Sequence, residues 1–160
     1  MGYTTDFTGH FEITPTLTEE HRAFLVKFNE TRRMKRNVDP KYGVDGEWYV
    51  DGTGDFGQDH DPNIPDYNGP PSTQPGLWCQ WVPSKDGTEL SWDGGEKFYS
   101  YEEWLKYLNE QYLKPRGYTL SGEVRWQGED PTDIGLLQMI DGTVRVLHGV
   151  VHFEYEEEQA

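Results

Sequence analysis

Large aromatic side chains supply most of the apolar material from which this chain can build a core. The sequence holds six Trp, ten Tyr and seven Phe, although only 34% of its 160 residues are hydrophobic. Each aromatic side chain buries about 150–250 Å², so a few of them fill the interior of one domain. A chain of this length is too short for two ordinary domains. We therefore expect one domain over residues 1–155 and a frayed acidic tail at 156–160.

The first part of the chain predicts a strand followed by a helix. Residues 9–17 alternate apolar and polar side chains, which is typical of a strand. Thr18 favours the start of a helix that runs to about Met34. Its buried face would consist of Phe24, Leu25 and Phe28.

A basic cluster falls in the last turn of this predicted helix: Arg32, Arg33, Lys35 and Arg36. Cations at a helix C-terminus are stabilised by the helix dipole. Because no other basic cluster occurs in the sequence, any direct phosphate contact would depend on this one.

Three further strands are predicted in the middle of the chain. Residues 47–50 indicate a short strand, and residues 77–82 and 88–92 indicate two more. Asp86-Gly87 between the last two favours a hairpin turn.

The second predicted helix begins after Ser100. Ser100 and Glu103 match a capping box, and Tyr99 and Trp104 have the spacing of a hydrophobic staple. Pro115 and Gly117 would end the helix.

Strands are predicted again after this helix. Residues 118–126 place Tyr118, Leu120, Val124 and Trp126 on one side of a strand. A second hairpin is expected around Asp141-Gly142, and residues 150–155 also indicate extended chain. The order of elements predicts an α+β fold, a mostly antiparallel sheet with two helices packed against it.

The negative charge of the chain is unevenly distributed. The net charge is −15, and residues 42–160 alone carry seven basic and 23 acidic side chains, a net −16. Such a surface repels nucleic acid and anionic lipid, and it attracts basic surfaces. The sequence has neither a run of about 18 apolar residues nor a signal-peptide pattern at its start, so we expect a cytoplasmic protein that is not membrane-bound.

An Asp- and Pro-rich stretch, residues 54–71, is predicted to form an ordered acidic rim. The binding candidates of this acidic surface are Asp51, Asp55, Asp59, Asp61 and Asp66. Asp59, Asp61 and Asn63 resemble the opening of a calcium loop, but Ile64 stands where Gly is needed and Pro70 where Glu is needed. We therefore expect neither a metal nor another cofactor here.

A pocket lined by tryptophan is the second candidate site. Trp faces stack sugars or bases, and carboxylate pairs can carry out acid–base chemistry. The candidates are Trp78, Trp81, Trp92, Asp93, Glu96, Trp126, Glu129 and Asp130. The same pattern would also arise if each Trp simply packed into the core.

Nucleophilic and zinc chemistry have little support in the sequence. The five histidines show no zinc-binding spacing, and the single cysteine, Cys79, is expected to be a small buried apolar residue. Phosphate-binding glycine loops and the G-x-S-x-G elbow are absent from the sequence.

Several long strings resemble a family of small acidic proteins from bacteria and their phages, whose members have no assigned activity: DYNGPP, QPGLWCQW, DGTELSWDGGEKFY, EEWLKYL and GEVRWQGEDPTDIG. The resemblance covers nearly the whole chain. It implies no catalytic activity and favours an accessory role associated with phage. The segment VVHFEYEEEQA is a departure from the family pattern.

Three functions stay open at this point. The first is a non-enzymatic binding protein that docks on a basic protein partner, for example as an inhibitor of a nucleic-acid-handling protein that presents DNA-like charge. The second is a nucleotide or sugar binder with a Trp-lined pocket. The third, the least favoured, is a carboxylate-based hydrolase.

Overall fold

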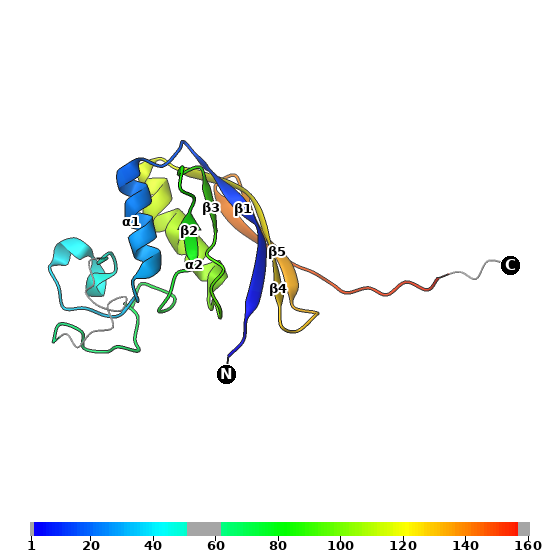
Figure 1. The fold of residues 1–160 in the computed structure, drawn as a ribbon, viewed down its shortest axis with the longest axis horizontal. Coiled ribbons are helices and arrows are strands. Elements are labelled where there is room, and N and C mark those ends of the chain that lie inside the picture. Colours follow the sequence, from blue (N-terminus) through cyan, green and yellow to red (C-terminus); the bar gives the residue numbers. More distant parts are fainter. Residues whose placement is uncertain (1, 51–61, 157–160) are drawn as a thin grey trace.

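A six-stranded antiparallel sheet forms the centre of the computed structural model, which describes residues 2–50 and 62–156 (Figure 1). The strand order across the sheet is β2-β3-β1-β4-β5-β6. Their bounds are β1 Thr5–Thr14, β2 Trp81–Pro83, β3 Glu89–Trp92, β4 Thr119–Gly128, β5 Ile134–Ile140 and β6 Thr143–His148.

Two helices lie on one side of this sheet (Figure 1). α1 spans Glu19–Glu30, and α2 spans Tyr101–Tyr107 and continues as a π-helical turn over Leu108–Leu113. Short 3-10 turns occur at Pro40–Tyr42, Val44–Gly46 and Lys114–Arg116. This architecture confirms the predicted α+β class with a sheet and two helices in one domain.

The long pairing of β1 with β4 separates a buried face from a solvated one. Phe7, Phe11 and Ile13 of β1 point into the core, as do Val124 and Trp126 of β4. The alternate residues point to the other face, where they are exposed. The period of two is the one expected for an antiparallel sheet that is covered on one side only.

Both predicted hairpins are confirmed. β2 pairs with β3 around Asp86-Gly87, and β5 pairs with β6 around Asp141-Gly142. Asp141 and Gly142 both have positive φ values, 51° and 75°. This conformation matches a type I′ turn, which suits the twist of paired strands.

α1 is shorter than predicted. Thr18 does cap it, since its Oγ1 accepts a hydrogen bond from His21 N at 3.2 Å. The helix ends at Glu30 rather than near Met34, because Thr31 is extended and Arg33 N donates to Leu77 O at 2.7 Å. Tertiary hydrogen bonds replace the helical ones from this point on.

The predicted capping box of α2 is wrong, although the helix itself is confirmed. Ser100 lies in the left-handed region at φ 58°, and its side chain makes no capping hydrogen bond. Trp104 is fully buried, whereas Tyr99 is 55% exposed at the surface. The backbone bond from Trp104 N to Ser100 O, 2.9 Å long, closes the first turn instead.

Other boundaries also differ from the predictions, and β2 covers Trp81–Pro83 rather than residues 77–82. β1 begins at Thr5 and ends at Thr14, because Pro15 has no N–H for the ladder. Residues 47–50 form no strand, and residues 150–156 follow β6 without strand pairing. In the described part of the chain, no helix is long and apolar enough to cross a membrane.

Gly135 provides a test of the packing inside the sheet. Gly135 lies opposite Trp126, and a Cβ there would overlap the Trp126 ring and the Leu147 carbonyl. We expect Gly135→Ala to lower the free energy of unfolding by about 1–3 kcal/mol, measured by urea denaturation. Gln138→Ala on the same strand is the control and should cost less than about 0.5 kcal/mol. Equal losses in the two variants would contradict this packing.

Asp86 makes the first hairpin sensitive to pH. Its carboxylate accepts hydrogen bonds from the Thr88 side chain, the Ser84 side chain and Thr88 N, which lower the pKa of Asp86 to about 2. A lowered pKa contributes stability above the ordinary value of 3.8 and loses it as the pH falls toward about 2. Asp86→Asn should therefore melt at a lower temperature than the wild type at pH 7.

The difference between these two proteins should shrink between about pH 4 and about pH 2, as read from thermal unfolding curves. Glu123→Gln on the exposed face of β4 serves as the control for a general change in charge. A difference that stays constant with pH would show that the Asp86 carboxylate is not the cause.

Candidate ligand-binding cleft around Trp78

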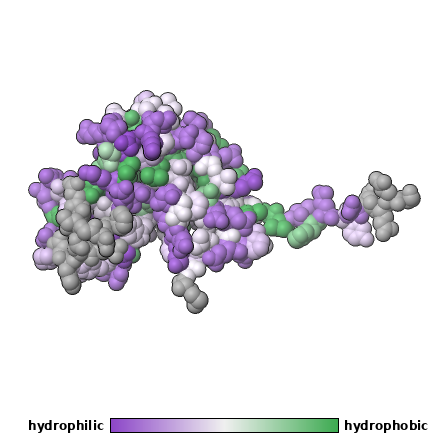
Figure 2. Space-filling model, in the orientation of Figure 1, coloured by the Kyte–Doolittle hydropathy of each residue, from purple (hydrophilic) through white to green (hydrophobic). Residues whose placement is uncertain are grey.

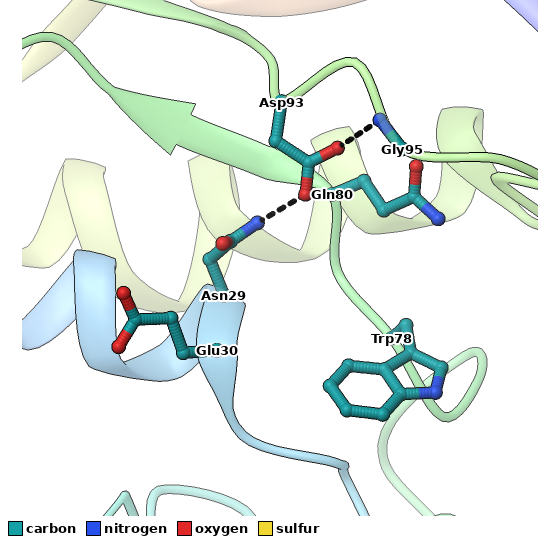
Figure 3. A pocket seen from close by; sticks show the side chains of 6 residues that line it. All are labelled: Asn29, Glu30, Trp78, Gln80, Asp93 and Gly95. Carbon is teal, nitrogen blue, oxygen red and sulfur yellow. Dashed lines mark hydrogen bonds between the residues drawn. The ribbon is translucent and has the colours of Figure 1, made fainter. Parts of the chain in front are cut away.

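Two adjoining hollows meet at Trp78 and Gln80, and we call them together the Trp78 cleft. The first, about 440 Å³, is also lined by Asn29, Glu30, Asp93 and Gly95 (Figure 3). The second, about 530 Å³, is also lined by residues that include Pro70, Pro75, Glu96, Lys97 and Tyr99. Both volumes fall in the range of about 300–1,000 Å³ that is typical of small-ligand pockets.

The chain that enters β2 places Trp78 in the cleft by simple alternation. Cys79 and Trp81 are buried at 0% and 1% exposure, whereas Trp78 and Gln80 are only partly buried. Successive side chains of extended chain point to opposite sides. The core therefore holds the odd-numbered residues here, and the cleft receives the even-numbered ones.

Asn29 joins the end of α1 to the strands beside the cleft. Its Nδ2 donates to Cys79 O at 2.9 Å and to Asp93 Oδ2 at 3.0 Å. Asp93 Oδ1 in turn accepts from Gly95 N at 2.7 Å (Figure 3). The wall of the first hollow is thus held from three segments that are far apart in the sequence.

Gln80 fixes the boundary between the two hollows. Its Oε1 accepts from Trp92 Nε1 at 3.1 Å, and its Nε2 donates to Glu96 O at 2.9 Å. Trp92 Nε1 also donates to Gly95 O at 3.1 Å. Because these polar groups bond one another, they hold a rigid frame around the indole of Trp78.

The rim of the cleft carries more negative than positive groups. Glu30 and Asp93 lie at the first hollow, and Glu96 and Lys97 lie at the second. All four are exposed. An aromatic ring beside carboxylates suits a cationic guest, through cation–π contact and charge, and it also suits the faces of a sugar.

Only part of the predicted tryptophan pocket exists. Trp78, Asp93 and Glu96 do line the cleft. Trp81 and Trp126 are 1% and 2% exposed and belong to the core, so their proposed role in a pocket is corrected. Trp92 does not line either hollow; its ring lies 5.4 Å from that of Phe7, and its Nε1 donates to Gln80 Oε1.

Glu129 and Asp130, the predicted carboxylate pair, both accept hydrogen bonds from backbone N–H groups. Glu129 Oε1 accepts from Thr4 N at 2.9 Å, and Asp130 Oδ1 accepts from Thr132 N and Oγ1 at 2.8 Å each. The bonds from Thr132 lower the pKa of Asp130. Each carboxylate thus holds a backbone segment in place, which gives no support to acid–base catalysis.

The predicted acidic rim is only partly covered by the structure. Asp51, Asp55, Asp59 and Asp61 lie outside the described residues. Asp66 is exposed, and its Oδ1 accepts from Asn68 N at 2.9 Å, as expected for an Asp in a turn.

The basic cluster does not form a helix end. The guanidinium group of Arg33 is buried, donates from Nη2 to Tyr49 O and lies 4.3 Å from the centre of the Phe28 ring. Burial lowers the pKa of Arg33 to about 9. Arg36 is also buried and donates to Met34 O and Arg32 O.

Arg32 donates to Tyr67 O at 3.0 Å. All three arginines therefore donate hydrogen bonds to backbone carbonyl groups. These bonds engage side chains that a phosphate group would otherwise contact.

A histidine with two carboxylates is the one group among the described residues that could hold a metal ion. The ligand atoms of His10, Glu12 and Glu89 lie within 4.8 Å of one another on the exposed sheet face. His10 Nε2 lies 3.2 Å from Glu12 and 3.5 Å from Glu89, so ion pairing explains the same geometry. Cys79 is buried, and burial raises the pKa of its thiol to about 12, as suits an apolar role.

Sequence reasoning missed most of the other residues that line the cleft, among them Asn29, Glu30 and Gln80. Asn29 follows Phe28 on α1, and nothing in its local sequence indicates that it faces β2. Gln80 could have been found from its place between Cys79 and Trp81, where alternation puts it beside Trp78.

Comparison with family models, with curated proteins and with solved structures found no match for this chain.

The different roles of two tryptophans give a prediction. Trp81→Ala removes a side chain that is 1% exposed and should cost about 3–5 kcal/mol of unfolding free energy. Trp78→Ala should cost less than half as much, because Trp78 is only partly buried. Urea unfolding of the two variants provides the measurement, and a loss for Trp78→Ala as large as that for Trp81→Ala would mean that Trp78 is a core residue.

Proposed function

We propose that this chain is a non-enzymatic binding protein that docks on a basic protein partner and takes a Lys or Arg side chain of that partner into the Trp78 cleft. The observation that carries the proposal is the partly buried indole of Trp78 between two hollows whose rim includes Glu30, Asp93 and Glu96. A cation above a Trp face contributes about 0.5–2 kcal/mol.

The charge of the rest of the chain supports the same kind of partner. Residues 42–160 carry a net charge of −16. Such a field speeds the encounter with a basic surface and disfavours acidic competitors. The long-range charge would bring the partner close, and the Trp78 cleft would then set the position of one anchoring side chain.

A nucleic-acid-handling protein is the partner class that this proposal favours. Such proteins present Lys and Arg to phosphate groups, and a carboxylate-rich surface can occupy the same groups. The resemblance to small acidic proteins of bacteria and their phages agrees with the role of an inhibitor, and a cytoplasmic location suits it.

A nucleotide or sugar binder is the second candidate. The two hollows support it by their volumes, about 440 and 530 Å³, and by the amide groups of Asn29 and Gln80 beside an aromatic face. The carboxylates at the rim disfavour a phosphorylated guest and leave a neutral sugar as the better fit.

Binding of an Arg-rich peptide, measured by isothermal titration calorimetry, tests the first proposal. We expect binding that weakens between about 0.1 M and about 1 M salt, over which the screening length falls from about 10 to about 3 Å. Trp78→Ala should weaken it by about tenfold, whereas Trp78→Phe, which keeps an aromatic face, should weaken it less.

Charge variants distinguish the contribution of the cleft to binding from the contribution of the overall negative charge. Glu30→Gln at the cleft and Glu123→Gln on the far sheet face remove the same charge, so a larger effect of Glu30→Gln is expected. Equal effects of the two, together with full binding by Trp78→Ala, would refute the anchoring role of the cleft. Binding that is independent of salt would refute docking led by charge.

The second candidate has its own measurement. Tryptophan fluorescence is followed while neutral sugars and nucleotides are added to the wild type and to Trp78→Ala. A saturable change in fluorescence that is lost in Trp78→Ala would favour the small-ligand function over the docking function. If none of the sugars and nucleotides changes the fluorescence, the small-ligand function is refuted.

A further inference from the structure

An apolar segment leaves the body of the protein directly after β6. Residues 149–156 run away from the sheet as extended chain (Figure 1). Val150, Phe153 and Tyr155 are 86%, 90% and 94% exposed. Figure 2 shows apolar side chains along this segment where it leaves the body. Contiguous exposed apolar side chains mark an interaction surface.

The segment has the pattern of a strand without a partner. Val151, Phe153 and Tyr155 alternate with the polar residues His152, Glu154 and Glu156. This period of two is typical of a strand with one buried face. The last sheet bond of the chain is the one from Gly149 N to Ile134 O, 2.8 Å long, and the residues that follow form no described strand pairing.

β6 offers a free edge next to this segment. It lies last in the strand order and pairs with β5 on one side only. The unpaired N–H and C=O groups of an edge strand form a ready template for another strand. Leu147 on β6 is 42% exposed and faces away from the helices.

We propose that two copies of this chain associate through these features. Residues 150–155 of each copy add antiparallel to the free edge of β6 of the other copy, about a two-fold axis near Gly149. The two six-stranded sheets then become one continuous sheet, and each exposed segment gains a strand partner.

The backbone directions of β6 agree with this pairing. Because Gly149 N bonds to β5, the N–H and C=O groups of Val144, Val146 and His148 point to the free edge. An antiparallel register centred on Gly149 joins Val146 to His152 of the other copy by these groups. It also places Leu147 opposite Val151 on the outer face of the sheet.

An aromatic contact fits the same register. Arg145 lies opposite Phe153 of the other copy on the outer face of the sheet, which allows a cation–π contact. Glu154 lies opposite Val144 on the other face of the sheet.

The size of the contact fits a weakly associating dimer. The register pairs residues 143–155 of the two copies, about 13 residues a side. A standard interface of about 1,600 Å² has about 20–30 residues a side, so this contact would bury roughly 700–1,000 Å². Folding back onto β6 of the same chain would require a reversal at Gly149, whereas the segment continues straight on (Figure 1).

The mass of the full chain in solution, by light scattering on a size-exclusion column, tests the proposal. We expect twice the 18.6 kDa of one chain. A variant that stops at Gly149 and the variant Phe153→Lys should both run as monomers, because the first removes the strand and the second places a cation opposite Arg145 in place of an aromatic ring. Ile140→Ser, which changes an exposed apolar residue outside the segment, should remain a dimer. A monomeric wild type, or a dimer that survives removal of the segment, would overturn the proposal.

A disulfide cross-link tests the register. Cα atoms of directly opposite, non-hydrogen-bonded antiparallel residues lie about 4.5 Å apart, which a disulfide can span. The double variant Leu147→Cys with Val151→Cys should therefore form covalent dimers under mild oxidation, and the buried Cys79 should not interfere. Val151→Cys alone is the control and should form few. Equal yields from the double variant and the control would overturn the antiparallel arrangement.

Discussion

The burial of large aromatic rings between the sheet and the helices is the constraint on which the rest of the structure depends. Phe7 at the middle of the sheet contacts rings from β2, β3 and α2, including Trp81 at 5.5 Å and Tyr101 at 5.0 Å. A second set joins α1 to α2, where Phe28 lies 5.8 Å from Trp104. Edge-to-face pairs of this kind stabilise beyond their buried area, so a chain with few aliphatic residues still obtains a dense core.

The aromatic core also explains why the Trp78 cleft can be rigid. Trp81 and Cys79 are held inside, and the alternation of extended chain then presents Trp78 and Gln80 on the opposite side. Buried arginines that bond to loop carbonyls hold the segments beyond α1, with Arg33 between Phe28 and Tyr49 O. The cleft is a consequence of packing in the core combined with polar bonds between distant loops.

Elements whose signal is local were predictable from the sequence. The hairpins at Asp86-Gly87 and Asp141-Gly142 follow from turn chemistry within a few residues, and the buried side of β4 follows from alternation. The end of α1 was not predictable, because Arg33 N bonds to Leu77 O, a residue far along the chain. The capping box failed for a similar reason: the path of the chain into α2 puts Ser100 in a left-handed conformation.

The amino-acid sequence alone determined the fold class, the turns of both hairpins and the negative charge, because each depends on composition or on neighbours in the chain. Only the tertiary structure decided which tryptophans are accessible, since Trp78 and Trp81 lie three residues apart in one largely apolar string. The two side chains differ in exposure because successive side chains of an extended chain point to opposite sides. One side faces the core, and the other side faces solvent. The tertiary structure likewise brought Asn29 to Asp93, since the contact between α1 and the β2–β3 hairpin has no local signature.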